Sequence, residues 1–211
     1  MWNTQLILIE GLGGSGKTTT VRYLEQVLLG KNLDVVAIVE SDSCHPKFKF
    51  PNFVECYTSQ MLEEWSLFFS ERKGKDEVCL MEGHGWQPMA EFMYLAGYSQ
   101  QSVLSFCEDV AAIIRPLNPV VVYYTHKDVV SHLERIEKLR GRQWISFMEG
   151  RDTRHHGLKK FGSSLLQFWR EWAVLQDELF RRCSFPKERI QTPHDDWDVT
   201  YMKIRNFLQI E

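Results

Sequence analysis

The sequence predicts an α/β fold, a three-layer sandwich in which a parallel sheet of about five strands carries helices on both faces. Short apolar or β-branched runs alternate along the chain with longer segments of helical periodicity. A glycine-rich loop also follows the first apolar run and precedes a helical segment. Because strand, helix and strand units of this kind have right-handed crossovers, the strands should lie parallel.

The expected strands share short runs of apolar or β-branched residues that end at polar residues or glycine. They cover 5–9, 33–39, 78–81, 120–124 and 189–191. The run at 5–9 is nearly continuous in apolar residues, as in a central strand buried on both faces. The runs at 33–39 and 78–81 both end in carboxylates, which open α/β sheets place at the ligand-binding edge.

The expected helices share apolar residues at spacings of three and four. They cover 19–29, 59–72, 88–97, 101–115, 128–140, 158–182 and 198–208. Gly30 is a natural cap for the first of them, and Pro116 ends the helix at 101–115. The segment 44–58 has no clean period and is expected to be a loop. Glycines interrupt 141–157, which predicts a mobile lid at about 140–157 instead of a packed element.

Length and composition limit the class of protein. The 211 residues suffice for a single domain, which we expect to span 1–211. A net charge of −3 gives no general attraction for nucleic acid or an anionic membrane, so neither is an expected partner. The five cysteines contain no C-x-x-C pair, which disfavours a disulfide framework or thiolate zinc site. Without a basic leader or a membrane-length apolar run, a cytoplasmic protein is expected.

The glycine loop fits the phosphate-binding spacing G-x-x-x-x-G-K-[ST]. Glycines allow successive backbone N–H groups to converge on a polyphosphate, and the following helix adds the positive end of its dipole. The expected nucleotide-binding residues are Gly11, Gly13, Gly14, Ser15, Gly16, Lys17, Thr18 and Thr19. Lys17 would reach the β- and γ-phosphates of ATP, and the Thr18 hydroxyl would coordinate Mg²⁺.

The same glycines also fit a dinucleotide-binding pattern. Gly11, Gly13 and Gly16 spell G-x-G-x-x-G, and Glu40 stands about where such a fold places its ribose-binding acid. Lys17 and Thr18 favour the P-loop, because a triphosphate with Mg²⁺ requires a cation and a hydroxyl directly after the last glycine.

Three carboxylates follow the second and third expected strands. Either Glu40 or Asp42 could be the general base that takes a proton from an acceptor hydroxyl, and Glu82 could hold Mg²⁺ through water. The alternative is that all three are solvated carboxylates at strand ends.

Arginines gather in the expected lid. At least two of Arg140, Arg142, Arg151 and Arg154 are expected to stabilise the transferring phosphoryl group when the lid closes and excludes water. The alternative is a solvated basic loop, and the sequence does not rank the four.

With these motifs the chain resembles the P-loop kinases of nucleosides and nucleotides, and thymidylate kinases most closely. Leu133-Glu134-Arg135-Ile136 with Arg140-Gly141 is similar to the family's lead-in to its lid. Leu67-Phe68-Phe69-Ser70-Glu71-Arg72 resembles the family's helix in which a Phe stacks on the acceptor base and an Arg reads its edge. The resemblance therefore implies that Phe68 and Arg72 contact the acceptor.

The chain also departs from this family. Where thymidylate kinases end the third strand with Asp-Arg-Tyr, this chain has Glu82-Gly83-His84, which lacks the Arg that clamps the acceptor phosphate. The resemblance therefore leaves room for an acceptor without a phosphate. His84 is a candidate acceptor contact, and an ordinary loop histidine is the alternative.

The expected function is an ATP- and Mg²⁺-dependent kinase for a nucleoside, a nucleotide or a similar small hydroxyl acceptor. The alternative is a P-loop ATPase or nucleotide-dependent switch that has no small-molecule acceptor. No N-K-x-D guanine reader follows the fourth expected strand, which disfavours a GTPase. The sequence leaves the acceptor's identity and the oligomeric state open, with a homodimer among the possibilities.

Overall fold

The computed structural model describes residues 3–42, 59–83, 89–153, 164–191 and 196–210. Its strands form one parallel sheet, which confirms the α/β prediction. They are β1 Leu6–Gly11, β2 Asp34–Ile38, β3 Glu77–Glu82, β4 Val120–Thr125 and β5 Lys187–Gln191. The order β2-β3-β1-β4-β5 makes β1 central, so the glycine loop lies in the middle of one sheet edge.

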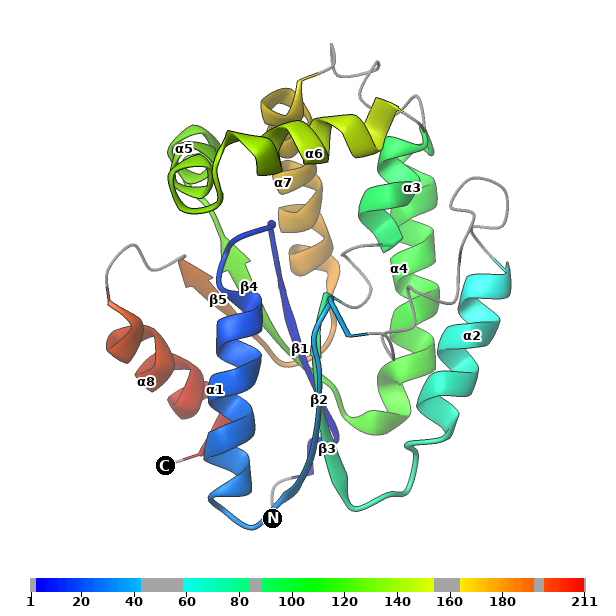
Figure 1. Cartoon of the computed structure of the whole chain (residues 1–211). Coiled ribbons are helices and arrows are strands. Elements are labelled where there is room, and N and C mark those ends of the chain that lie inside the picture. Colours follow the sequence, from blue (N-terminus) through cyan, green and yellow to red (C-terminus); the bar gives the residue numbers. More distant parts are fainter. Residues whose placement is uncertain (1–2, 43–58, 84–88, 154–163, 192–195, 211) are drawn as a thin grey trace.

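Helices connect the strands and cover both faces of the sheet (Figure 1). They are α1 Lys17–Leu29, α2 Ser59–Ser70, α3 Glu91–Leu95, α4 Gln100–Ile114, α5 Val129–Arg140, α6 Arg142–Thr153, α7 Leu165–Arg182 and α8 Trp197–Leu208, with a 3₁₀ turn η3 Arg115–Leu117. Figure 1 shows α1 and α8 on one face and α2, α4 and α7 on the other. In the described chain, no helix combines the length and apolarity needed to cross a membrane.

Side chains of β1 alternate between two apolar cores, as expected for a strand covered on both faces. Leu6 and Leu8 belong to the core beneath α2, α4 and α7. Ile7 and Ile9 belong to the core beneath α1 and α8. The chain leaves β1 toward β2 and later adds β4 on the opposite side, so the carboxyl end of β1 is a switch point at which such sheets bind ligands.

The segment expected to be an unpacked lid is largely helical. Residues 142–153 form α6, which packs between α5 and α7 through the half-buried side chains of Trp144, Ile145 and Met148. Gly141, with φ of 79°, ends α5 and turns the chain into α6. The prediction of an unpacked segment was wrong here, because these three apolar residues have helical spacing and can pack on one face despite the glycines nearby. Residues 154–157 lie outside the described chain.

Other boundaries differ from the sequence expectation by a few residues at each end. The helix expected at 158–182 is described from Leu165 onward, with Ser164 as its N-cap, and 158–163 lie outside the described residues. The loop expected at 44–58 also lies outside them. The short helix expected at 88–97 is α3, and the last strand begins two residues earlier than expected.

Candidate active site

The glycine loop joins the end of β1 to the start of α1. Gly14 and Gly16 have φ of 73° and 98°, left-handed values that a residue with a Cβ adopts only with strain. Gly16 is the N-cap of α1 and supplies no side-chain hydrogen bond to the helix. The first N–H groups of α1 therefore lack a side-chain cap, as in helix starts that bind anions.

Lys17, Thr18 and Glu82 meet at the carboxyl edge of the sheet. The buried Lys17 ammonium donates to the carbonyls of Gly11 and Leu12 at 3.0 and 3.1 Å, and its Nζ lies 4.0 Å from Glu82 Oε1. The Thr18 hydroxyl donates to Glu82 Oε2 at 2.8 Å. Groups predicted from two separate segments, the glycine loop and the end of β3, thus form one cluster.

Thr18 and Glu82 also suit a magnesium ion. A hydroxyl and a carboxylate oxygen, 2.8 Å apart, are hard donors of the kind that Mg²⁺ prefers, with substrate phosphates and water completing its shell. Among the residues that the structure describes, no three His, Cys, Asp or Glu side chains are grouped to hold a metal by themselves.

The two candidate bases after β2 have different surroundings. The backbone N–H of Glu40 donates to Glu82 Oε2 at 3.3 Å, which places this residue beside the cluster. The Asp42 carboxylate is bound to its own loop and to α1 instead: its Oδ2 accepts from the Val39 N–H at 2.9 Å and lies 3.8 Å from Arg22 Nη2. The geometry therefore brings Glu40 closer to the predicted chemistry than Asp42.

A further contact anchors the start of α1. The Thr20 hydroxyl pairs with the Tyr124 hydroxyl on β4, and burial raises the pKa of this phenol. The Ser15 side chain is buried inside the loop, and Thr19 is exposed on the first turn of α1. The first turn of α1 is thus attached to β4 of the sheet.

Side chains of α5, α7 and α8 surround the loop. The ring of His132 on α5 bonds the carbonyl of Gly13 at 2.9 Å, and Arg135 donates to the carbonyl of Gly14 at 3.2 Å. A Cβ at Gly13 would lie 3.4 Å from the Trp169 ring of α7, and one at Gly16 would lie 2.2 Å from the Trp197 ring of α8. His132, Trp169 and Trp197 were not predicted from the sequence as site residues. The spacing of His132 and Arg135, which places both on one helix face, was the available signal.

A cavity of about 390 Å³ adjoins the loop through Leu12. It lies between the end of β4, the start of α5 and the α7 residues Arg170 and Asp177. Its polar lining includes Lys127 and Asp128, the second of which caps α5. This space at the carboxyl edge of the sheet was not anticipated from the sequence.

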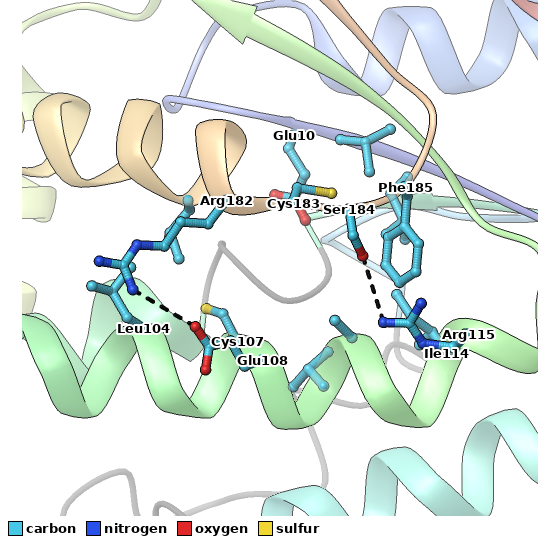
Figure 2. Close-up of a pocket in the computed structure, with 15 residues that line it drawn as sticks. Glu10, Leu104, Cys107, Glu108, Ile114, Arg115, Arg182, Cys183, Ser184 and Phe185 are labelled. Atoms are coloured by element: carbon cyan, nitrogen blue, oxygen red, sulfur yellow. Dashed lines mark hydrogen bonds and ion pairs between the residues drawn. The ribbon is translucent and has the colours of Figure 1, made fainter.

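A second cavity, of about 140 Å³, lies between α4 and α7 (Figure 2). Glu10 and Cys107 line it, and burial together with the charge of Glu10 raises the pKa of the Cys107 thiol. Figure 2 shows two contacts at its edge, Arg182 with Glu108 at 3.7 Å and Arg115 with Ser184 at 3.5 Å. The Glu10 side chain therefore faces the α4 and α7 layer, away from α1.

Comparisons with known proteins agree with this geometry at the level of the fold. No family model matches the sequence, and no curated protein is significantly similar to it. Among solved structures, thymidylate kinase from Ehrlichia chaffeensis superposes with a TM-score of 0.60 over 98% of this chain and 100% of its own. This chain has a P-loop kinase fold that resembles thymidylate kinase. At 12% identity the likeness concerns the fold alone.

Within this P-loop kinase fold, Phe68 and Arg72 lie at the wrong edge to read an acceptor. Phe68 is buried in the core, and the Arg72 guanidinium stacks on its ring at 3.9 Å. Arg72 Nε lies 3.8 Å from Oε1 of Glu77, the first residue of β3, whereas Glu82 ends that strand at the glycine loop. Five residue steps along a strand separate the two edges by about 16 Å. The expectation of acceptor contacts for Phe68 and Arg72 was therefore wrong.

Two of the four lid arginines, Arg140 and Arg142, have described side chains in this P-loop kinase fold. Arg140, at the end of α5, stacks over the Trp144 ring of α6 at 5.1 Å. Arg142 is exposed at the start of α6. Arg151 lies in the last turn of α6 with its side chain undescribed, and both Arg154 and His84 lie outside the described residues. Their roles stay predictions.

Proposed function

We propose that this chain is an ATP- and Mg²⁺-dependent small-molecule kinase that transfers the γ-phosphoryl group to a small hydroxyl acceptor. One observation carries the proposal: Lys17, Thr18 and Glu82 converge beside an uncapped helix start at the carboxyl edge of the sheet. This combination matches what a triphosphate with its metal requires.

The residues of the cluster would divide the work of binding and charge stabilisation. Charged phosphate oxygens are stronger acceptors than the carbonyls of Gly11 and Leu12, so the Lys17 ammonium would shift to them when ATP binds. Thr18 and Glu82 would hold Mg²⁺, which neutralises charge on the β- and γ-phosphates.

During transfer the acceptor oxygen bonds to the γ-phosphorus while the bond to the bridging β,γ-oxygen breaks and ADP leaves. The proton of the acceptor hydroxyl passes to a carboxylate. We favour Glu40 for this role, because Asp42 is occupied by the Val39 N–H and the neighbouring Arg22.

The acceptor is proposed to be an uncharged hydroxyl compound such as a nucleoside. Gly83 follows Glu82 at the position where the Arg of a phosphate clamp would stand in the family that this chain resembles. Without that Arg, an acceptor phosphate would lack one charged partner at this edge.

A coupled ADP-release assay tests the proposal, with ATP and Mg²⁺ fixed and a panel of nucleosides, nucleoside monophosphates, aminoglycosides and simple sugars. Strong stimulation by one acceptor class over the no-acceptor control is the expected result. Hydrolysis that ignores every acceptor would overturn the kinase proposal and favour the alternative of a P-loop ATPase or switch.

Two lysine variants make the assay specific to the loop. Lys17→Met should abolish ADP release, because it removes the cation from the loop. Lys31→Met, in the exposed turn after the far end of α1, should leave it unchanged. Full turnover by Lys17→Met would refute the role assigned to the loop.

A further inference from the structure

The four residues from Leu12 to Ser15 form a turn whose central peptide bond can point either way. The Ser15 N–H donates to the Leu12 carbonyl at 3.2 Å, and Gly14 has φ of 73°, as the third residue of a type II turn requires. Types I and II differ mainly by rotation of the central peptide, here that between Gly13 and Gly14. Glycine at both central positions makes each orientation accessible, so the loop sequence alone does not select one.

His132 on α5 holds this central peptide. Its Nε2 lies 2.9 Å from the Gly13 carbonyl oxygen, and because a carbonyl only accepts, Nε2 must carry the hydrogen. Nδ1 then carries the ring's acceptor lone pair, toward which Arg135 Nη2 donates at 3.4 Å. The same Nη2 donates to the Gly14 carbonyl at 3.2 Å. Consecutive loop carbonyls are thus bonded by two residues one helical turn apart.

The histidine itself is firmly held. Only 1% of its surface is exposed, and its ring lies against the rings of His126 and Trp169, with centroids 3.6 and 5.9 Å away. Asp128 caps the first turn of α5 by accepting from the N–H groups of Val130 and Ser131. The donor is therefore preorganised before any nucleotide arrives.

Fixing the carbonyls also fixes the N–H groups, because C=O and N–H point in opposite directions across a trans peptide. The Gly14 N–H therefore faces away from His132, and the Ser15 N–H faces away from Arg135. The Ser15 N–H donates to the Leu12 carbonyl, which also accepts from Lys17 Nζ at 3.1 Å. The side of the loop that faces away from Arg135 is therefore the side on which Lys17 lies.

We propose that His132 and Arg135 are positioning residues that lock the Leu12–Ser15 turn so that the Gly14 N–H faces the phosphates. The proposal rests on the proposed function, since it concerns the same loop. It adds a specific requirement: a hydrogen-bond donor at the position of His132 Nε2.

The test is isothermal titration calorimetry with ADP and Mg²⁺ on wild type and single variants. His132→Leu should weaken ADP binding about 10- to 100-fold, because the Gly14 N–H would lose its orientation toward the charged phosphate, and a hydrogen bond to a charged group is typically worth this much. His132→Gln, whose amide nitrogen reaches about as far as Nε2, should retain near wild-type affinity, whereas the shorter His132→Asn should not. Glu134→Gln, an exposed charge change on the same helix, is the matched control.

The possible outcomes separate this inference from the proposed function. If wild type does not bind ADP with Mg²⁺, the proposed function fails. If wild type binds and a folded His132→Leu binds equally well, the positioning role is overturned. If His132→Leu does not fold, the comparison of His132→Gln with His132→Asn tests the proposal. Equal ADP affinity of these two variants would overturn the need for a donor at the position of Nε2.

An amide NMR titration provides a readout that a merely structural role would not move. Adding ADP and Mg²⁺ should shift the Gly14 amide resonance strongly in wild type and His132→Gln, and weakly in His132→Asn. Equal shifts in all three proteins would contradict the proposal.

Discussion

The buried ion pair of Lys17 and Glu82 predicts a measurable coupling free energy between the two side chains. Their charged atoms lie 4.0 Å apart, with side chains 3% and 7% exposed. At that distance and an effective dielectric constant of about 20, two unit charges attract by about 4 kcal/mol. Loss of hydration offsets part of this, so we expect a coupling of about 1–3 kcal/mol.

A double-mutant cycle isolates this coupling. The variants are Lys17→Met, Glu82→Gln and their combination, each unfolded with urea in the absence of nucleotide. Lys17 also bonds loop carbonyls, and Glu82 also accepts from Thr18. Each of these bonds is lost with its own side chain in both the single and the double variant, so its contribution cancels from the coupling. The coupling should also persist at high salt, because buried charges are weakly screened.

An exposed pair on α1 provides the comparison. Arg22 and Glu25 are closer, at 3.1 Å, but their side chains are 48% and 27% exposed. Their coupling should be about 0.2–1 kcal/mol and should fall with salt. If Lys17 and Glu82 behaved additively within about 0.5 kcal/mol, or coupled no more strongly than the exposed pair, the reasoning from burial would be refuted.

Three other perturbations test particular parts of the structure. Phe68→Ala should lower the free energy of unfolding by about 3–5 kcal/mol, as measured by urea unfolding. Calorimetry should show unchanged ADP affinity in the folded variant, and weaker ADP binding would contradict the place of Phe68 at the edge opposite the glycine loop. Burial and the charge of Glu10 raise the pKa of the Cys107 thiol, so this thiol stays protonated at pH 8 to 9. Mass spectrometry should show that iodoacetamide labels Cys107 far more slowly in folded than in unfolded protein, and rapid labelling of the folded protein would refute this. Gly16→Ala, at φ of 98° and with its Cβ 2.2 Å from the Trp197 ring, should lower both the melting temperature and ADP affinity in thermal-shift titrations, and an unchanged melting temperature would argue against the crowding.

Local pattern was enough to predict most of the fold. Strand positions follow from short apolar runs, helices from apolar spacing, and the phosphate loop from glycines that have to adopt left-handed conformations, as Gly14 and Gly16 do. The meeting of Thr18 with Glu82 was also predictable, since carboxyl ends of neighbouring parallel strands share one edge.

A family resemblance misled the prediction at α2. Phe68 and Arg72 were expected at the acceptor, but only a short link joins Arg72 to the first residue of β3. A short connection into a strand leaves the end of the helix beside the strand's amino end, which is opposite the glycine loop. The link length in this chain was a better guide than the similarity of the helix sequence.

The sequence by itself determined the order of elements and the chemistry of the loop, because both depend on residues near one another in the chain. Tertiary structure alone decided which distant side chains support that loop. His132 and Arg135 lie some 120 residues beyond Gly13 and Gly14, and α6 is packed through Trp144 between two other helices. These contacts depend on how α5, α6 and α7 cross the sheet edge, a geometry that side-chain packing sets over the whole core.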